Sequence, residues 1–506
     1  MTAEACIEWA RHYARRRLNS LLADEHRCLP PNVFLDFGRR GLLGLTAPEQ
    51  DGGCGLKAGD ALRVLHQISI IDVSLGNAIG MHNFLGGKVL LAHLQPEVRD
   101  RWKADIASGR LLAAFALTEL EAGSDPRRMT TVAHRLADGT WLLNGHKAWC
   151  GLAAWSGISA VFAQGFDEGG RRLGITGFAV PLDLSGVSQG PESVTMGLRS
   201  VVQNQLNFED VSLGPEYVLG LPGQGMEVAQ TGMMTGRIAM TLFANAAALR
   251  ALQLARQYVS ERKIAGGLMA ENPVVSDRIS KESARTQSVH LFLEYCFDIF
   301  DRDDEPSMLV CLASKIVGPE QSWMTLDTCL QLLGARGYTE PNGMARIYRD
   351  ARVIRIFEGP TEAMTAYLGA WTAVKSDEVK ELLVGSLNAA DLWEHLKPFT
   401  EPVSPRSPLR QSLSRPEVLR LEFDLGTRTA HAIFLAVVRC QAGGSNPDRL
   451  AVRLMEEVYA EVATQCPRRA EWCFKEGAAE LAELLEGLVG DVSETKGAEK
   501  WQPDDF

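Results

Sequence analysis

The chain has 506 residues, 46% of them hydrophobic, and a formal net charge of −11 at pH 7. A chain of this length normally forms more than one hydrophobic core, so we expect several domains. The acidic balance, without a long block of basic residues, argues against nucleic acid as a partner. The N-terminus lacks the features of a secretory signal, and the longest strongly apolar stretch, Ala432 to Val438, is far shorter than the roughly 18 residues that span a bilayer. We therefore expect a cytoplasmic protein without a transmembrane segment.

The cysteines predict neither a disulfide framework nor a zinc site. Ten cysteines are scattered from Cys6 to Cys473, without a Cys-x-x-Cys pair or a Cys/His cluster at metal-ligand spacing. We expect them to be reduced and mostly buried. No histidine and aspartate arrangement accompanies Cys150, so a catalytic thiol is not expected there.

The N-terminal part of the chain predicts a helical domain followed by a small β domain. Residues 1–112 show helical periodicity broken by glycine-containing turns. Residues 113–215 contain short runs separated by turn signals such as Asn144-Gly145, and the stretch from Gly174 to Val180 resembles a strand. We expect this second region to form a small β-barrel or sandwich.

Helical periodicity returns over residues 216–372. Apolar residues recur at helical spacing there, as at Ile238, Leu242 and Ala246. The order of helices, strands and helices indicates an α+β fold with segregated parts and argues against alternating βαβ units. Gly223-Gln224-Gly225 is therefore not interpreted as a dinucleotide fingerprint, because no strand-turn-helix context with a following acidic residue accompanies it.

Residues 373–506 predict a linker and a helical extension. Segments Glu417 to Arg439 and Asp448 to Val489 have the pattern of amphipathic helices with charged faces, as in a small bundle. The stretch before them is rich in proline, which favours a linker or an extended crossing. Its prolines are Pro398, Pro402, Pro405, Pro408 and Pro416.

Two motifs stand out in the predicted β domain. The first runs from Phe115 through Ala116-Leu117-Thr118-Glu119 to Ala122-Gly123-Ser124-Asp125, and the second is Leu143-Asn144-Gly145-His146-Lys147-Ala148-Trp149. A strand backbone with a short hydroxyl can hold an aromatic cofactor ring flat and hydrogen-bond its polar edge. His146 is interpreted as a surface residue of a hairpin and not as a catalyst.

Two further motifs lie in the predicted helical bundle. One extends from Gly236-Arg237 through Glu261-Arg262-Lys263 to Asn272-Pro273. The other comprises the segments Gln331 to Tyr338, Tyr348 to Arg352 and Ile356 to Glu362. In order and spacing the four motifs together resemble those of the acyl-CoA dehydrogenase family. The resemblance implies an N-terminal helical domain, a central β domain and a C-terminal four-helix bundle, followed here by an extra helical region.

The resemblance also implies a cofactor, partners and site residues. It implies FAD, an acyl thioester substrate, an electron-transfer flavoprotein or similar acceptor, and a homodimer or homotetramer, because the family shares flavin sites between subunits. It places substrate contacts at Ser124, Arg237 and Gly359. It places FAD contacts at Phe115, Leu117, Thr118, Ser124, Trp149, Gly151, Arg262, Gln331, Ala335, Pro360 and Glu362.

Glu358 matches the family's catalytic base. Removing an α proton next to a thioester carbonyl requires a carboxylate in a dry pocket, where desolvation makes it a stronger base. Ile356 and Phe357 are bulky neighbours that could exclude water, and Gly359 permits close approach. Some family members carry the base immediately before the arginine that matches Arg237, a position that Gly236 occupies here. The resemblance therefore assigns the base to Glu358.

The sequence departs from the family pattern at Gly151, Ala265, Pro273 and Pro360, where flavin contacts are expected. A family member that has lost its flavin and acts as an assembly partner is therefore an open alternative interpretation. Met234 replaces an acidic residue often found three positions before the arginine, so an acyl carrier protein could replace CoA as the carrier. The sequence also leaves open an acyl-CoA oxidase, which uses dioxygen, and a flavin monooxygenase of the same fold. The Glu358 motif favours a dehydrogenase over both.

Overall fold

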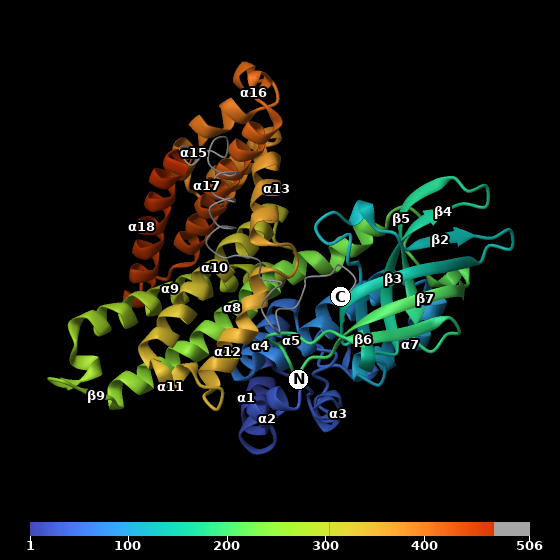
Figure 1. Ribbon diagram of the computed structural model, residues 1–506, viewed down its shortest axis with the longest axis horizontal. Helices are drawn as coiled ribbons and strands as arrows, with labels where there is room; N and C mark the ends of the chain where they lie inside the picture. Colours follow the sequence, from blue (N-terminus) through green and yellow to red (C-terminus); the bar gives the residue numbers. More distant parts are fainter. Residues whose placement is uncertain (303, 470–506) are drawn as a thin grey trace, which may run out of the picture.

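Helices and strands are segregated in the computed structural model, which describes residues 1–302 and 304–469, and the α+β prediction is confirmed. In Figure 1 the N-terminal helices lie at the base of the molecule, the sheet to one side and the long helices to the other. The N-terminal elements are α1 (Ala3–Arg17), α2 (Ser20–Glu25), α3 (Pro31–Arg39), α4 (Ala58–Ile71), α5 (Val73–Gly80), the π-helical turn Met81–Gly86, α6 (Gly87–His93) and α7 (Pro96–Ser108).

The β domain consists of one connected sheet of eight strands. Its main path runs β6-β7-β3-β2-β4-β5-β8, and β1 pairs with β4 off this path. β1 and β2 are parallel to β4, whereas the other pairs are antiparallel. The strands are β1 (Ala113–Ala116), β2 (Val132–Arg135), β3 (Trp141–Gly151), β4 (Ile158–Phe166), β5 (Arg172–Pro181), β6 (Val187–Glu192), β7 (Gln203–Leu213) and β8 (Val218–Leu219).

The predicted turn at Asn144-Gly145 is wrong, because both residues lie inside β3. The β3–β7 register shifts between Leu143 and Gly145, and Gly145 has a φ of 137°. The extra residue of this β-bulge lies on β7, opposite the Asn-Gly pair, and Gly145 adopts a backbone angle that other residues avoid. His146 consequently lies on a strand opposite Asn207 and not in a hairpin turn.

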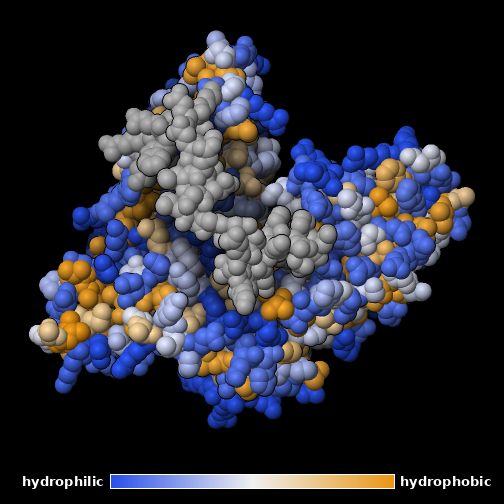
Figure 2. Space-filling view, in the orientation of Figure 1, coloured by the Kyte–Doolittle hydropathy of each residue, from blue (hydrophilic) through white to orange (hydrophobic). Residues whose placement is uncertain are grey.

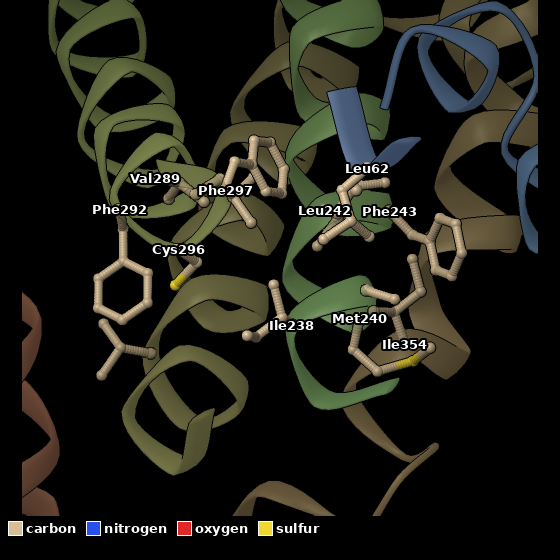
Figure 3. Packing of buried hydrophobic residues seen from close by; sticks show 14 of the residues in the cluster. Leu62, Ile238, Met240, Leu242, Phe243, Val289, Phe292, Cys296, Phe297 and Ile354 are labelled. Carbon is tan, nitrogen blue, oxygen red and sulfur yellow. The ribbon is translucent and has the colours of Figure 1, made fainter. Parts of the chain in front are cut away.

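Long helices form the second helical region, as the periodicity predicts. They are α8 (Gly225–Glu261), α9 (Pro273–Phe300), α10 (Met308–Leu333), α11 (Ala335–Tyr338), α12 (Gly343–Arg352) and α13 (Thr361–Val374), with the hairpin β9 (Lys263–Ile264) and β10 (Gly267–Leu268) after α8. Figure 3 shows α8 contributing side chains to a shared core between α9 and the segment before α13. The labelled residues are Leu62, Ile238, Met240, Leu242, Phe243, Val289, Phe292, Cys296, Phe297 and Ile354.

Helix α8 is the one helix of the described residues that is long and apolar enough to cross a membrane. Of its most apolar 18-residue window, 78% is buried inside the structure. A helix that is apolar on every side is expected in the centre of a bundle, where all its faces are covered. Burial between α4, α9 and α10 therefore accounts for the composition of α8.

The prediction of a proline-rich linker is wrong. The segment forms α14 (Ser376–Lys380), a π-helical turn (Glu381–Ser386), α15 (Ala390–Val403) and α16 (Pro408–Ser412), followed by α17 (Arg415–Gln441) and α18 (Asn446–Arg469). Pro398 and Pro402 lie inside α15, on its more exposed side, while Leu392, Trp393 and Leu396 are buried. Burial of that apolar face holds the helix together despite the missing backbone donors.

The other two prolines that belong to helices occupy positions where proline is harmless. Pro408 and Pro416 lie in the first turns of α16 and α17, where the backbone N–H has no helical partner in any case. The predicted helix Glu417 to Arg439 is confirmed as part of α17. The other predicted segment begins close to the start of α18, and its part beyond Arg469 lies outside the described residues.

The extension packs on the bundle through a backbone contact between α13 and α17. A Cβ atom added to Gly369 would lie 1.6 Å from the carbonyl oxygen of Glu422, and one added to Gly426 would lie 2.0 Å from that of Thr365. Only glycine allows the two helices to approach this closely. Helix α13 therefore belongs both to the bundle and to the extension.

Candidate active site

Glu358 lies in the short loop between α12 and α13, facing α8. Its φ is 55° and that of the next residue, Gly359, is 92°. A left-handed backbone at a residue other than glycine is uncommon and is often found at functional sites. A Cβ atom at Gly236 would lie 3.2 Å from the Glu358 carboxyl carbon and 3.3 Å from its Oε2. The missing side chain at Gly236 therefore makes the room that the carboxylate occupies.

The Glu358 carboxylate is enclosed and unsatisfied. The residue as a whole is half-buried, yet Oε2 is shielded from solvent and has no hydrogen-bond partner among the described residues. Burial raises the pKa of Glu358, and the positive charges of Arg237 and Lys315 oppose that rise. A buried carboxylate without a hydrogen bond is unfavourable unless a ligand completes the site. Oε2 in this position is available to accept a proton from a bound molecule.

The prediction that Ile356 and Phe357 exclude water from the carboxylate is wrong in part. Ile356, expected to shield the carboxylate, is 51% exposed, whereas Phe357 packs partly against the core. The carboxylate faces Gly236 of α8 and lies within the electrostatic influence of Arg237 and Lys315. Its surroundings are therefore a mixture of backbone and positive charge, and not simply an apolar pocket.

Lys315 is a residue of this site that the sequence did not assign. Its ammonium group is fully buried on α10 and donates a 2.9 Å hydrogen bond to the carbonyl of Ile354, four residues before Glu358. Burial lowers the pKa of Lys315 to about 8, against the opposing effect of Glu358. The signal in the sequence is a single lysine inside the apolar run from Leu309 to Val317 of α10. A charge in such a run is rarely placed without a partner.

Arg237 follows Gly236 on α8 and is one of the three predicted substrate contacts. Its Nε is buried without a hydrogen-bond partner among the described residues, and its Nη1 lies 3.3 Å from the sulfur of Met234. Close by on the same helix, Thr235 accepts a 2.9 Å hydrogen bond from Lys88 of α6. The structure thus brings Arg237 and Glu358 together, with a second cation close by.

A second group of predicted residues gathers where β1 and β3 meet. Leu117 and Thr118 directly follow β1, and the carbonyl of Thr118 accepts a 3.0 Å hydrogen bond from the backbone N–H of Ala148. The β3–β7 register shifts between Lys147 and Cys150, and within this bulge Trp149 has a φ of 52° and is 43% exposed. The bulge therefore turns a large aromatic surface outward beside Thr118.

A buried ion pair holds this corner together. Lys147 and Glu119 are fully buried, with Nζ and Oε1 2.8 Å apart. Glu119 also accepts hydrogen bonds from the backbone N–H groups of Thr130 and Thr131, and Lys147 donates to the carbonyl of Leu117. Although burial alone would raise the pKa of Glu119, Lys147 and these donors lower it to about 2. Both residues stand in the quoted motifs, but their structural role was not predicted.

Gly151 ends β3 at a point where a neighbouring side chain fills the space beside it. A Cβ atom there would lie 2.5 Å from the sulfur of Met81. Met81 begins the π-helical turn that packs on both β1 and α8, and so connects the two groups of residues. The neighbouring Cys150 is buried, which raises the pKa of its thiol to about 12 and leaves it protonated. This agrees with the expectation that Cys150 is no nucleophile.

The cysteines elsewhere in the described residues are mostly buried thiols. The described cysteines are free, and Cys440 is the only one of them that is exposed. No group of histidine, cysteine, aspartate and glutamate suited to a metal ion occurs within residues 1–302 and 304–469.

Comparisons with known proteins identify the family. Three family models match the chain: the acyl-CoA dehydrogenase N-terminal domain over residues 2–110, the middle domain over residues 114–211 and the C-terminal domain over residues 223–372. The chain belongs to the acyl-CoA dehydrogenase family. As the family predicts, the protein is an oxidoreductase with FAD as its cofactor.

Relatives within the acyl-CoA dehydrogenase family share about a quarter of their residues with this chain. The short-chain specific mitochondrial acyl-CoA dehydrogenase of Homo sapiens is 28% identical over 71% of this chain and 87% of its own length. An acyl-CoA dehydrogenase of Bacillus subtilis is 28% identical over 66% of this chain and 87% of its own length. The very long-chain specific enzyme of Macaca fascicularis is also 28% identical, over 68% of this chain and 53% of its own length. These equal identities do not distinguish substrate lengths.

Solved acyl-CoA dehydrogenase structures share the fold. An acyl-CoA dehydrogenase complexed with FAD from Bacillus anthracis has a TM-score of 0.80 at 19% identity and covers 99% of this chain and 92% of that one. Butyryl-CoA dehydrogenase from Megasphaera elsdenii has a TM-score of 0.67 at 23% identity, covering 72% of this chain and 95% of that one. The first comparison extends across the C-terminal helices, whereas the second does not.

The corner where β1 meets β3 is suited to a flavin of the acyl-CoA dehydrogenase type. Trp149 offers an exposed aromatic surface, and the Thr118 hydroxyl makes no hydrogen bond within the described residues. A planar ring with a polar edge requires both features. Phe115 packs its ring against Phe162, 5.1 Å away, so its side chain belongs to the sheet core. Ser124 is exposed on the loop after β1.

Other predicted FAD contacts lie on the opposite side of this acyl-CoA dehydrogenase subunit. Arg262, Gln331 and Ala335 are exposed, at the β9–β10 hairpin and around the start of α11. Figure 1 shows these elements at the side of the molecule away from the sheet. One subunit therefore does not bring these residues to Thr118 and Trp149. Pro360 and Glu362, by contrast, begin α13 directly after Glu358, and Glu362 is exposed.

Proposed function

We propose that this protein dehydrogenates an acyl thioester between Cα and Cβ, with Glu358 as the base, to give the trans-2-enoyl thioester. The observation that carries the proposal is the enclosed, unpartnered Oε2 of Glu358 beside Gly236 and Arg237. Burial raises its pKa, and a carboxylate with a raised pKa is a stronger base once it is ionised. The positive charges of Arg237 and Lys315 oppose that rise and favour the ionised form.

Thr118 and Trp149 would hold the isoalloxazine ring, with Leu117, Ser124 and Gly151 beside them. The flavin, when bound, accepts the hydride that leaves the substrate Cβ. Glu358 takes the α proton onto Oε2, and its own backbone N–H, which donates no hydrogen bond within the described residues, is free for the thioester carbonyl. Such a donor stabilises negative charge that develops on the carbonyl oxygen. Arg237 would provide positive charge for the anionic part of the carrier, and Lys88, which is paired with Glu305 at 3.2 Å, lies close by on α6.

The exposed positions of Arg262, Gln331 and Ala335 support a shared flavin site. In a homodimer or homotetramer these residues of one subunit would reach the FAD of its neighbour. The guanidinium fork of Arg262 suits a pyrophosphate. Size-exclusion chromatography with light scattering tests the assembly. Arg262→Ala should lower the FAD content without altering the surroundings of Glu358. A monomer that holds FAD tightly would contradict the shared site.

The reaction is tested by the flavin absorbance under anaerobic conditions. Saturated acyl-CoA and acyl-carrier thioesters of graded length are added, and the flavin band should bleach with at least one of them. Glu358→Gln should keep the oxidised FAD spectrum and show no bleaching. If no thioester bleaches the wild-type flavin, the proposed reaction is wrong.

The electron acceptor is tested with the bleached enzyme. Recovery on addition of an electron-transfer flavoprotein, with stability in air, indicates a dehydrogenase. Rapid recovery in air with release of peroxide indicates an acyl-CoA oxidase. Bleaching by acyl-carrier thioesters at lower concentration than by acyl-CoA would identify the carrier protein as the natural donor.

A further inference from the structure

An arginine-lined groove lies between α1 and α3, on elements that supply none of the predicted active-site residues. It is open to solvent and has a volume of about 640 Å³. In Figure 2 the base of the molecule, where Figure 1 places α1 and α2, is largely hydrophilic. The groove is lined by Trp9, His12, Tyr13, Arg16, Arg17, Asp36, Arg39 and Arg40.

The groove concentrates positive charge in a protein that is acidic overall. Four guanidinium groups face one carboxylate, which leaves a surplus of three positive charges, whereas the whole chain carries −11. Within the described residues the ion pairs of the groove converge on Asp36, which meets Arg17 at 2.8 Å and Arg39 at 3.7 Å. Arg16 and Arg40 have no carboxylate within ion-pair distance in this part of the structure, and Arg40 Nε is buried without a hydrogen bond.

Helix stability alone does not explain this arrangement. Basic residues in the last turn of a helix are favourable, and both α1 and α3 end in arginines. Arg15 already places a positive charge in the last turn of α1, and it does not line the groove. The convergence of arginines from two helix ends on one cavity is a separate feature. Repulsion between them decreases when an anion binds.

The wall of the groove is aromatic and rigid. Trp9 stacks on Tyr13 with ring centroids 5.0 Å apart, and both meet Phe37 edge-on. The Tyr13 hydroxyl donates a 3.0 Å hydrogen bond to Asp36, which also holds Arg17. These contacts fix part of the lining before any ligand arrives, and a preformed site loses less conformational entropy on binding.

We propose that this groove binds a nucleoside di- or triphosphate. Guanidinium forks pair with phosphate oxygens in a bidentate manner, and three surplus positive charges match the charge of such a ligand. Trp9, the partly exposed member of the aromatic wall, offers a ring surface to a purine or pyrimidine, while Tyr13 and Phe37 are buried behind it. The volume falls within the roughly 300 to 1,000 Å³ of small-molecule sites. The proposal does not depend on the flavin reaction, because no groove residue belongs to that site.

Calorimetric titration of the FAD-loaded protein tests the proposal. In about 0.15 M salt, where exposed charges more than a Debye length apart are largely screened, ADP and ATP should bind saturably with one site per subunit. AMP should bind at least about tenfold more weakly because it carries fewer charges. Inorganic pyrophosphate should also bind more weakly because it lacks the ring. Pyrophosphate binding as tightly as ADP would overturn the nucleoside assignment.

Variants locate the bound ligand. Arg16→Ala and Arg39→Ala each remove one exposed guanidinium, and each should weaken ADP binding by about tenfold or more. Arg15→Ala is the matched control, on the same helix but outside the groove, and should leave ADP binding unchanged. Absence of saturable binding overturns the proposal. It is also overturned if ADP binds equally to all three variants, which would place the nucleotide in the flavin or substrate site.

Discussion

At the scale of single residues, opposing influences act on Glu358. Burial favours its protonated form, while Arg237 and Lys315 favour the carboxylate. The left-handed backbone at Glu358 and the absence of a side chain at Gly236 together place the carboxylate against α8. The charge of the flanking cations favours the ionised form of an enclosed carboxylate, and burial limits the water that competes for its lone pairs.

Replacing Glu358 by glutamine tests its role as the base. The substitution keeps the shape of the side chain but removes the proton acceptor, so reduction of the flavin by substrate should slow by at least about 100-fold. Stopped-flow absorbance under anaerobic conditions measures this rate. The FAD content must equal that of the wild type, and a rate within a few-fold of wild type would assign the base elsewhere.

Gly236 offers a second test of the same geometry. Because a Cβ there would lie 3.2 Å from the Glu358 carboxyl carbon, a carboxylate carried on residue 236 can occupy nearly the same space. The double variant G236E/E358G should therefore recover activity by about tenfold or more over Glu358→Gly alone. Steady-state dehydrogenation measures the difference. Equal inactivity of the double and single variants, with FAD retained in both, would show that α8 does not face the reacting carbon.

Lys315 is expected to act as a positioning residue through its charge. Because the ammonium lowers the pKa of Glu358, Lys315→Met should raise that pKa. The base works only when ionised, so activity rises with pH through the Glu358 pKa, and the acidic limb should move to higher pH in the variant. The pH dependence of kcat/KM measures this. Lys315→Arg, which keeps the charge, is the control, and a uniform loss of activity without a shifted limb would indicate a structural role only.

At the scale of elements, the Glu119–Lys147 pair fixes the loop after β1 to β3 and thus positions Thr118 beside Trp149. Breaking a buried pair by removing one partner leaves the other charge uncompensated, so Glu119→Gln should destabilise the protein by about 3 to 5 kcal/mol. Urea unfolding followed by circular dichroism measures this change. The double variant E119Q/K147M should be less destabilised than the sum of the single variants, because it leaves no unpaired charge.

The same pair predicts a pH dependence with a definite sign. The folded-state pKa of Glu119, about 2, is depressed below the ordinary value of 4.5. Its contribution to stability is therefore present above pH 4.5 and is lost as the pH falls toward 2. The stability difference between wild type and Glu119→Gln should shrink over that window. A constant difference would mean that Glu119 is not the ionised partner.

At the scale of the whole molecule, the extension is expected to unfold with the bundle because α13 and α17 touch through their backbones. Gly369→Ala or Gly426→Ala would force the helices apart and should destabilise the protein by about 1 to 3 kcal/mol. Thermal unfolding and the rate of proteolysis within the extension measure this. Gly343→Ala is the control, because a Cβ there meets nothing within 4 Å. Equal effects of all three substitutions would contradict a specific contact.

Much of the fold and part of the site could be predicted from the sequence. Motif order indicated the family, and helical spacing predicted α8 and α17. The prolines around α15 predicted a linker, but burial of the apolar face of α15 overrides their local preference. The Asn-Gly pair in β3 predicted a turn, but strand pairing overrides that preference. Lys315 was missed because its hydrogen-bond acceptor, the carbonyl of Ile354, lies 39 residues further along the chain, and nothing local in the sequence connects the two.

The distance between the two groups of predicted FAD contacts could not be predicted from the sequence. Arg262, Gln331 and Ala335 carry no local signal that they lie far from Thr118. Their positions follow from the lengths and directions of α8 and α10, which the periodicity predicts as elements but does not orient in space. The same applies to Met81, whose proximity to Gly151 depends on the packing of a π-helical turn against the sheet.

The shared helix α13 has a consequence for how this enzyme could be shortened. The loop that carries Glu358 runs directly into α13, and the far face of α13 is covered by α17. A truncation after residue 374 would keep the three matched family domains but would expose the buried face of α13, which includes Thr365, Leu368 and Gly369, on the outside of the bundle. Removing the extension would therefore destabilise the loop that carries Glu358, and a shorter version would first require a redesigned outer face on α13.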